Sequence, residues 1–206
     1  MQELVGECKA CKKPIFCNDG FINGVVLDDN TLICFECFKG ESEIEKWHRH
    51  LGAYGICLHE GSLLVIRKSN GPYIGRFDLP GGTIEPNETL AEAVRREIKE
   101  EAGIEIQIKK NIGVCDFIVP YLLPKRGTSH IHHVAIFYSV EYMGGNLSSN
   151  PKMFEGQDSL GALWVPVSEL YSENSSPLVL QAIEWLRSGE LPINIQRLDE
   201  WVVKKL

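Results

Sequence analysis

Residues 82–104 read GTIEPNETLAEAVRREIKEEAGI, and this stretch constrains the fold more than any other part of the chain. Its apolar residues recur at the three- and four-residue spacing of a helix, which predicts a helix from Leu90 to Ala102. Thr89 followed by Glu92 fits a capping box at the start of that helix. Gly103 stands where a helix-ending residue is expected.

Three acidic residues of this segment share one helical face. Glu97, Glu100 and Glu101 stand at i, i+3 and i+4, and these positions are neighbours on a helix with about 3.6 residues per turn. Like charges at this spacing cost about a few tenths of a kcal/mol per pair. A bound divalent cation would offset that cost, and carboxylate oxygens suit Mg²⁺ or Mn²⁺. A solvated charged face, paired with nearby arginine and lysine residues, is the alternative.

The whole segment resembles the Nudix box, G-x5-E-x7-R-E-U-x-E-E-x-G-U, where U is a bulky apolar residue. All nine specified positions are filled, by Gly82, Glu88, Arg96, Glu97, Ile98, Glu100, Glu101, Gly103 and Ile104. This resemblance to the Nudix hydrolases implies an α/β fold, an α/β/α sandwich with a mixed β-sheet, in which the box forms a loop, a helix and a loop. It also implies an Mg²⁺- or Mn²⁺-dependent enzyme that cleaves a diphosphate linkage in a nucleotide-like substrate.

The resemblance implies roles for individual residues. The metal ligands implied are the backbone carbonyl of Gly81 and the carboxylates of Glu97, Glu100 and Glu101. Glu97 could instead orient a catalytic water. Arg96 would hold a box glutamate through a charge-assisted hydrogen bond, and Glu88 would support the site from behind. Gly82 is predicted to contact the substrate.

A later segment, Phe154 to Gln157, resembles the part of the family that donates one more acidic residue. Glu155 is therefore predicted to be an additional metal ligand or the general base. Asp158 is the alternative residue for this role, and the alternative interpretation of Glu155 is an ordinary loop glutamate without a function. In the implied mechanism, divalent ions neutralise the diphosphate and activate a water, and a positioned glutamate takes the proton. The sequence leaves the identity of the base open.

The substrate is less well specified. Five basic residues could touch phosphates, although solvated surface is the alternative for each: Arg67, Lys68, Arg76, Lys125 and Arg126. Arg67 is our first choice and Arg76 the second. Pro120 resembles a marker of ADP-ribose cleavage and Tyr121 one of dinucleoside polyphosphate cleavage, so a nucleoside triphosphate and a nucleoside diphosphate linked to another group both stay open.

The N-terminal part carries two Cys-x-x-Cys pairs, which can supply four thiolates to a tetrahedral Zn²⁺. These pairs are Cys8 with Cys11 and Cys34 with Cys37. They resemble a zinc-ribbon or treble-clef module. Cys17 could replace one of the four ligands, and a redox-active or adventitious thiol cluster is the alternative to a zinc site. We place this module at residues 1–46 and the hydrolase domain at 47–206, with a helix-like stretch over 39–51.

Composition narrows the function classes. The 206-residue chain has a net charge of −7, which argues against binding nucleic acid through a broad basic surface. It has neither a transmembrane run nor a secretory start, so we expect a cytoplasmic protein without a membrane partner. The main alternative to an enzyme is a catalytically weak nucleotide-binding regulator whose zinc module contacts a partner or nucleic acid through Lys9, Lys12 and Lys13. A homodimer is left open.

The remaining pattern predicts further elements. A hairpin is expected over residues 54–67 around a Glu60-Gly61 turn. Strands are expected at 104–108, 113–119, 132–142 and 163–167, a helix at 177–187, and a strand or short helix in the tail at 198–206. His130 and His132 should share the polar face of an edge strand, with metal binding as the less favoured interpretation. Cys57 and Cys115 are expected in the core.

Overall fold

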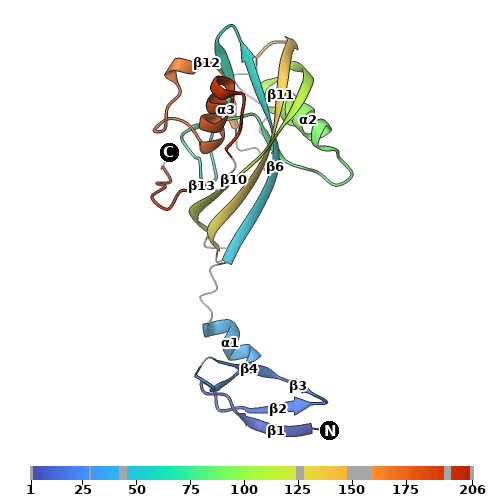
Figure 1. The fold of residues 1–206 in the computed structure, drawn as a ribbon, viewed down its shortest axis with the longest axis vertical. Coiled ribbons are helices and arrows are strands. Elements are labelled where there is room, and N and C mark those ends of the chain that lie inside the picture. Colours follow the sequence, from blue (N-terminus) through green and yellow to red (C-terminus); the bar gives the residue numbers. More distant parts are fainter. Residues whose placement is uncertain are drawn as a thin grey trace. The chain divides into compact units, whose positions relative to one another are not determined.

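The computed structural model describes residues 2–27, 29–41, 46–123, 128–147, 159–192 and 196–204. The chain divides into two compact units, Met1–Lys46 and Trp47–Leu206 (Figure 1). Within the described residues, no helix is both long enough and apolar enough to cross a membrane.

The first unit is small and mostly β. Strands β1 (Gln2–Glu7), β2 (Pro14–Asn18) and β3 (Phe21–Ile22) form an antiparallel sheet, and β4 (Gly24–Val26) pairs with β5 (Leu32–Cys34). Helix α1 (Phe35–Glu41) follows directly. Only Cys8, Ile15 and Ile33 are fully buried among its described residues, so the unit has little apolar core to stabilise it.

The second unit is built on a mixed sheet in the strand order β12-β7-β6-β11-β10-β13. Its long strands are β6 (Lys46–His59), β10 (Glu105–Leu123) and β11 (Thr128–Gly144), joined by β7 (Ser62–Lys68), β12 (Ser159–Pro166) and β13 (Gln196–Arg197). The pair β10–β11 is antiparallel and β10–β13 is parallel. Short strands β8 (Phe77–Asp78) and β9 (Gly81–Thr83) pair with β7 and β6.

One helix covers each face of this sheet. Leu63 and Val65 pack with α3 (Pro177–Ser188), whereas Leu64 and Ile66 pack with α2 (Leu90–Ala102). Because successive side chains of a strand point to opposite faces, the two apolar clusters lie on opposite sides of the sheet. A 3₁₀ turn, η1 (Val167–Glu169), links β12 toward α3. The expected α/β class with a mixed sheet is confirmed.

Local signals fix the ends of both helices. The capping box of Thr89 and Glu92 is present at the start of α2, and Gly103 ends it with φ 74°. Ser176 caps α3 and Gly189 ends it with φ 79°. In the turn from β6 to β7, Glu60 and Gly61 both have positive φ, as a two-residue hairpin turn requires. Between these ends, each helix is stabilised by the apolar residues that it buries along one face.

Several expectations were wrong. The stretch 39–51 is not one helix, because α1 ends at Glu41 and β6 begins at Lys46. Residues 104–108 and 113–119 do not form two strands but one continuous strand, β10, with irregular pairing near Asn111 and Gly113. The tail expected at 198–206 forms neither a strand nor a helix over its described residues, 198–204, and the two-residue β13 precedes it.

Candidate functional site

Two glycines bring β9 against the glutamate helix. Gly81 has φ +143°, and a Cβ there would lie 2.3 Å from the carbonyl oxygen of Ala53 on β6. A Cβ on Gly82 would lie 2.7 Å from Oε1 of Glu97. The pair therefore allows the backbone of β9 to approach both the sheet and the Glu97 carboxylate, which larger residues would prevent.

Arg96 connects the acidic residues of the box. Its Nε and Nη2 donate to the two carboxylate oxygens of Glu88 at 2.8 and 2.9 Å. Its Nη1 donates to Glu97 at 2.9 Å and to Glu100 at 3.3 Å, and Nη2 also reaches the carbonyl of Thr83 at 3.1 Å. One guanidinium thus binds three carboxylates and the β9 backbone, which fixes the helix against the strand.

The charges around these carboxylates differ in effect. The hydrogen bond from Arg96 lowers the pKa of Glu88, and the same hydrogen bond with Glu88 raises the pKa of Arg96 above its ordinary range. Burial raises the pKa of Glu97 despite the opposing effect of Arg96 and of the Lys68 ammonium. Glu97 is therefore a carboxylate in a partly desolvated place, where an added cation would favour its ionised form.

The other two box glutamates complete the acidic group. Glu101 is only 2% exposed and accepts a 2.9 Å hydrogen bond from the backbone N–H of Gly81. Glu100 is the most open, with 38% of its side chain exposed. Hard carboxylate oxygens beside a glycine cradle fit a divalent cation. Glu97 and Glu100 meet at Arg96, so binding an ion would require these two carboxylates to turn toward it.

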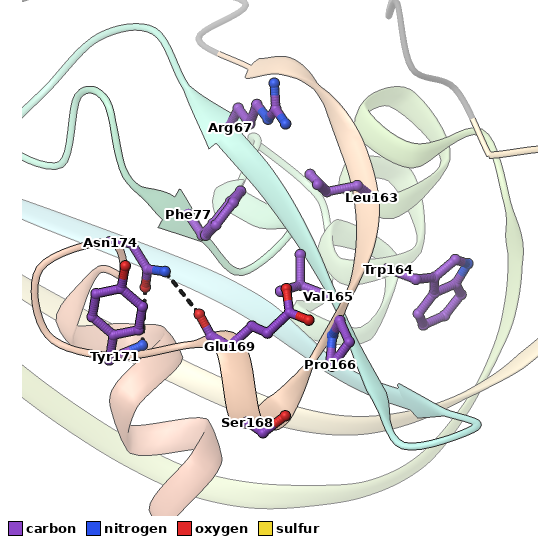
Figure 2. A pocket seen from close by; sticks show the side chains of 10 residues that line it. All are labelled: Arg67, Phe77, Leu163, Trp164, Val165, Pro166, Ser168, Glu169, Tyr171 and Asn174. Carbon is purple, nitrogen blue, oxygen red and sulfur yellow. Dashed lines mark hydrogen bonds between the residues drawn. The ribbon is translucent and has the colours of Figure 1, made fainter.

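Arg67 and Arg76, the two basic residues predicted to bind substrate, lie at different places in the structure. On β7, Arg67 continues the face of Leu63 and Val65, toward α3, and not the face of the glutamate helix. It lines a groove of about 620 Å³ between β7, β8, β12 and η1. Figure 2 shows Arg67 at one end of this groove, with Phe77 beside it.

Lys68 is the basic residue that strand alternation places on the side of α2. It follows Leu64 and Ile66, which pack on α2, and it is close enough to Glu97 to lower that group's pKa. Alternation along the strand indicates that Arg67 and Lys68 face opposite sides of the sheet, and the packing of Leu64 and Ile66 assigns Lys68 to the side of α2. Arg76 is buried at a separate place beside Trp201. Glu155, Asp158, Lys125 and Arg126 lie outside the described residues.

The four predicted zinc ligands come together in the first unit. The Sγ atoms of Cys8, Cys11, Cys34 and Cys37 all lie within 4.8 Å of one another, and among the described residues no other group of potential metal-binding side chains does this. The Cys11 and Cys34 sulfurs are 3.7 Å apart, close to the roughly 3.8 Å edge of a tetrahedron with Zn–S bonds of about 2.3 Å.

Backbone donors support thiolate character at Cys8. The N–H groups of Cys11 and Cys37 point to the sulfurs of Cys8 and Cys34, each at 3.5 Å. The first of these contacts contributes most to lowering the pKa of Cys8 to about 6, whereas side-chain hydrogen bonds with Cys11 and Cys34 raise the pKa of Cys37 to about 12. The donor set therefore fits Zn²⁺. Cys17 lies on β2 outside the cluster, while Cys57 and Cys115 are buried as expected.

The histidines of β11 belong to two different environments. His130 stacks on Trp47 with ring centroids 5.0 Å apart, and His132 pairs with Asp116 at 2.7 Å. His133 is buried, with its ring nitrogens 2.8 Å from the Tyr54 hydroxyl and 3.1 Å from the Tyr73 hydroxyl. The expected edge position was wrong, because β11 lies between β6 and β10.

Comparisons with known proteins agree on one family. The family model described as NUDIX domain matches residues 46–188. The chain is 34% identical over 110 residues to the ADP-ribose pyrophosphatase of Methanocaldococcus jannaschii, a match that covers 53% of this chain and 61% of that protein. It is 30% identical over 125 residues to the mouse (Mus musculus) 8-oxo-dGDP phosphatase NUDT18, covering 61% of this chain and 34% of the relative.

The solved structures agree at the level of fold. The NUDIX hydrolase from Nitrosomonas europaea superposes with a TM-score of 0.54 at 19% identity, covering 76% of this chain and 98% of that one. The chain spans less than two thirds of the length of the two sequence relatives above, at 61% and 34%.

Proposed function

The chain belongs to the NUDIX domain family, and from this premise we propose that its second unit hydrolyses a phosphoric anhydride bond in a nucleotide-like substrate. The observation that carries the proposal is the arrangement around Arg96. One guanidinium holds Glu88, Glu97 and Glu100 together, beside a Gly-Gly strand whose backbone can approach Glu97 because it carries no side chains.

The residues that would hold Mg²⁺ or Mn²⁺ are the Gly81 carbonyl and the carboxylates of Glu97, Glu100 and Glu101. A bound divalent ion supplies charge neutralisation of the diphosphate and a lowered pKa for a coordinated water. Glu155 stays a proposed additional ligand or base.

The chain's own groups then have distinct tasks. Arg96 keeps Glu97 and Glu100 on the same side of the helix, and its pairing with Glu88 holds the guanidinium in place. Glu97 would either bind the ion or take the proton of the attacking water, with Glu155 as the other candidate for the base. Lys68 lies on the side of β7 that faces α2 and would contact a substrate phosphate. Gly82, which has no side chain, would let that phosphate approach.

The substrate class is a nucleoside triphosphate or a nucleoside diphosphate linked to another group. This choice is supported by the names of two relatives, an ADP-ribose pyrophosphatase and an 8-oxo-dGDP phosphatase. Both names describe nucleotides that contain a diphosphate. The groove that Arg67 lines lies on the other face of β7, which makes Lys68 the stronger candidate for the reacting phosphates.

Residues 1–46 would form a zinc module and 47–206 the hydrolase domain. Four sulfurs within 4.8 Å of one another support structural Zn²⁺ in a unit with only three fully buried core residues among those described. Such a unit depends on metal binding for much of its folding free energy.

A substrate screen tests the proposal. Nucleoside triphosphates, ADP-ribose, sugar nucleotides and dinucleoside polyphosphates are incubated with Mg²⁺ or Mn²⁺, and the products are identified by mass. We expect Glu100→Gln to lose activity by roughly 100-fold or more. Glu105→Gln is the matched control, because Glu105 is exposed and pairs with Lys99, which stands at an unspecified position of the box. Equal activity of Glu100→Gln and the wild type would refute the proposed site.

A further inference from the structure

Arg76 lies just before β8 and has an environment unlike that of the other arginines. It is only 9% exposed. Its Nη2 donates to the carbonyl of Val202 at 3.0 Å, and its guanidinium carbon lies 4.1 Å from the centroid of the Trp201 ring. Both partners belong to the C-terminal segment 196–204, which we call the clamp.

The remaining donors of Arg76 are unsatisfied. Nε and Nη1 are buried and have no hydrogen-bond partner in the part of the chain that the structure describes. Among the described residues no carboxylate forms an ion pair with this guanidinium, whereas Arg96 binds three. Buried N–H groups without acceptors are rare and costly in folded proteins, and a buried charge without a counter-charge is costlier still. The position therefore calls for an anion that can accept from these nitrogens.

The clamp is attached to the sheet and to the segment before β8 by its own contacts. Leu198 N donates to the carbonyl of Ile118 at 2.9 Å, continuing the pairing of β13 with β10. The indole nitrogen of Trp201 donates to the carbonyl of Pro72 at 2.8 Å, and the ring stands edge-on to Tyr73 with centroids 5.7 Å apart.

The end of the clamp is held by one further residue. Lys204 Nζ donates to the carbonyls of Gly75 at 3.4 Å and Glu173 at 2.6 Å. These contacts keep the clamp over Arg76.

We propose that Arg76 and the clamp form an anion-binding site that receives a phosphate group and does not require a divalent ion. The planar guanidinium matches phosphate oxygens, and phosphate is the anion that the reaction described above would place at this protein. Only this choice of anion rests on the proposed function. Because the free nitrogens are buried, binding requires the clamp to move, and Trp201 must change its surroundings when it does.

The test measures thermal unfolding in buffer without phosphate or added divalent ion, followed by titration with inorganic phosphate or AMP. We expect phosphate to raise the melting temperature of the wild type. Arg76→Met should melt at the same or a higher temperature than the wild type in phosphate-free buffer, because a buried unpaired charge is replaced by an apolar chain of similar length. It should bind phosphate roughly tenfold or more weakly. Arg187→Met, at an exposed position on α3, should keep the full shift.

Two further arms separate the alternatives. Glu100→Gln should keep the phosphate shift even though it loses hydrolysis, so failure of the enzyme proposal leaves this measurement intact. A shift with AMP and inorganic phosphate alike assigns a simple phosphate site, and a shift with AMP alone assigns a nucleotide site. In both cases fluorescence of Trp201, read against Trp201→Phe, should change on binding. A wild type without any shift, or an Arg76→Met variant that keeps it, overturns the proposal.

Discussion

Replacing Gly82 with alanine should disable the acidic site while leaving the fold intact. The new Cβ would lie 2.7 Å from Oε1 and 3.0 Å from Cδ of Glu97. The carboxylate would have to retreat by about 0.7 Å to reach an ordinary contact of 3.4 Å. It is the free end of a flexible side chain, so the retreat is cheap for the fold, but it disturbs the 2.9 Å contact with Arg96.

A displacement of this size matters more for chemistry than for stability. Misplacing a reacting group by about 1 Å costs about 100-fold in rate. We therefore expect Gly82→Ala to lower kcat by about 100-fold and to weaken Mn²⁺ binding, measured by titration calorimetry, by about tenfold. The free energy of unfolding, measured in urea, should change by less than about 1 kcal/mol.

Gly81→Ala is the contrasting variant. Its Cβ would meet backbone atoms, the Ala53 carbonyl oxygen at 2.3 Å and the Tyr54 Cα at 2.7 Å, at a φ of +143°. Neither atom can move without shifting β6, so we expect a loss of about 2 kcal/mol or more in stability. Wild-type activity in Gly82→Ala, or equal destabilisation by the two variants, would refute this reasoning.

Three other perturbations test separate parts of the account. Arg96→Lys replaces a planar guanidinium with five donors by one ammonium group. We therefore expect roughly 2 kcal/mol lower stability and about 100-fold lower kcat. A variant with unaltered stability and kcat would contradict the proposed role of Arg96 in holding the glutamates. Burial lowers the pKa of His133 well below its ordinary 6.5, so below about pH 6.5 the unfolded chain takes up a proton that the native state refuses. Between pH 7 and pH 5.5, stability measured in urea should therefore fall by about 1.2 kcal/mol more in the wild type than in His133→Gln, and an equal fall in both would exclude this contribution. One zinc ion per chain, measured by elemental analysis, should persist in Cys17→Ser and disappear in Cys34→Ser, and zinc retained in the second variant would show that the cluster is not the site.

Local sequence patterns were sufficient for α2 and α3 but not for α1 or for the strands. Thr89, Glu92 and Gly103 mark the ends of α2 because capping depends on residues close together in the chain. The length of β10 depends instead on its pairing with β11 across the sheet, which no local pattern records. For the same reason, β11 could not be recognised as an interior strand from its histidines.

The candidate site shows the same division. The acidic residues of the box share a helix face, so spacing alone could group them. Arg67 and Lys68 are adjacent in sequence and point to opposite faces of β7, and only the packing of their neighbours shows which one lies toward α2. Trp201 and Val202 bury Arg76, although Val202 is 126 positions away from it in the sequence. No sequence pattern indicated this contact.

The most direct test of the acidic site is anomalous diffraction from crystals soaked in Mn²⁺. A strong peak is expected within about 2.0–2.3 Å of carboxylate oxygens of Glu97, Glu100 and Glu101, with the Gly81 carbonyl completing the set, and it should vanish in Glu100→Gln. Well-ordered crystals with these carboxylates still bound to Arg96 and no manganese beside them would contradict the assignment.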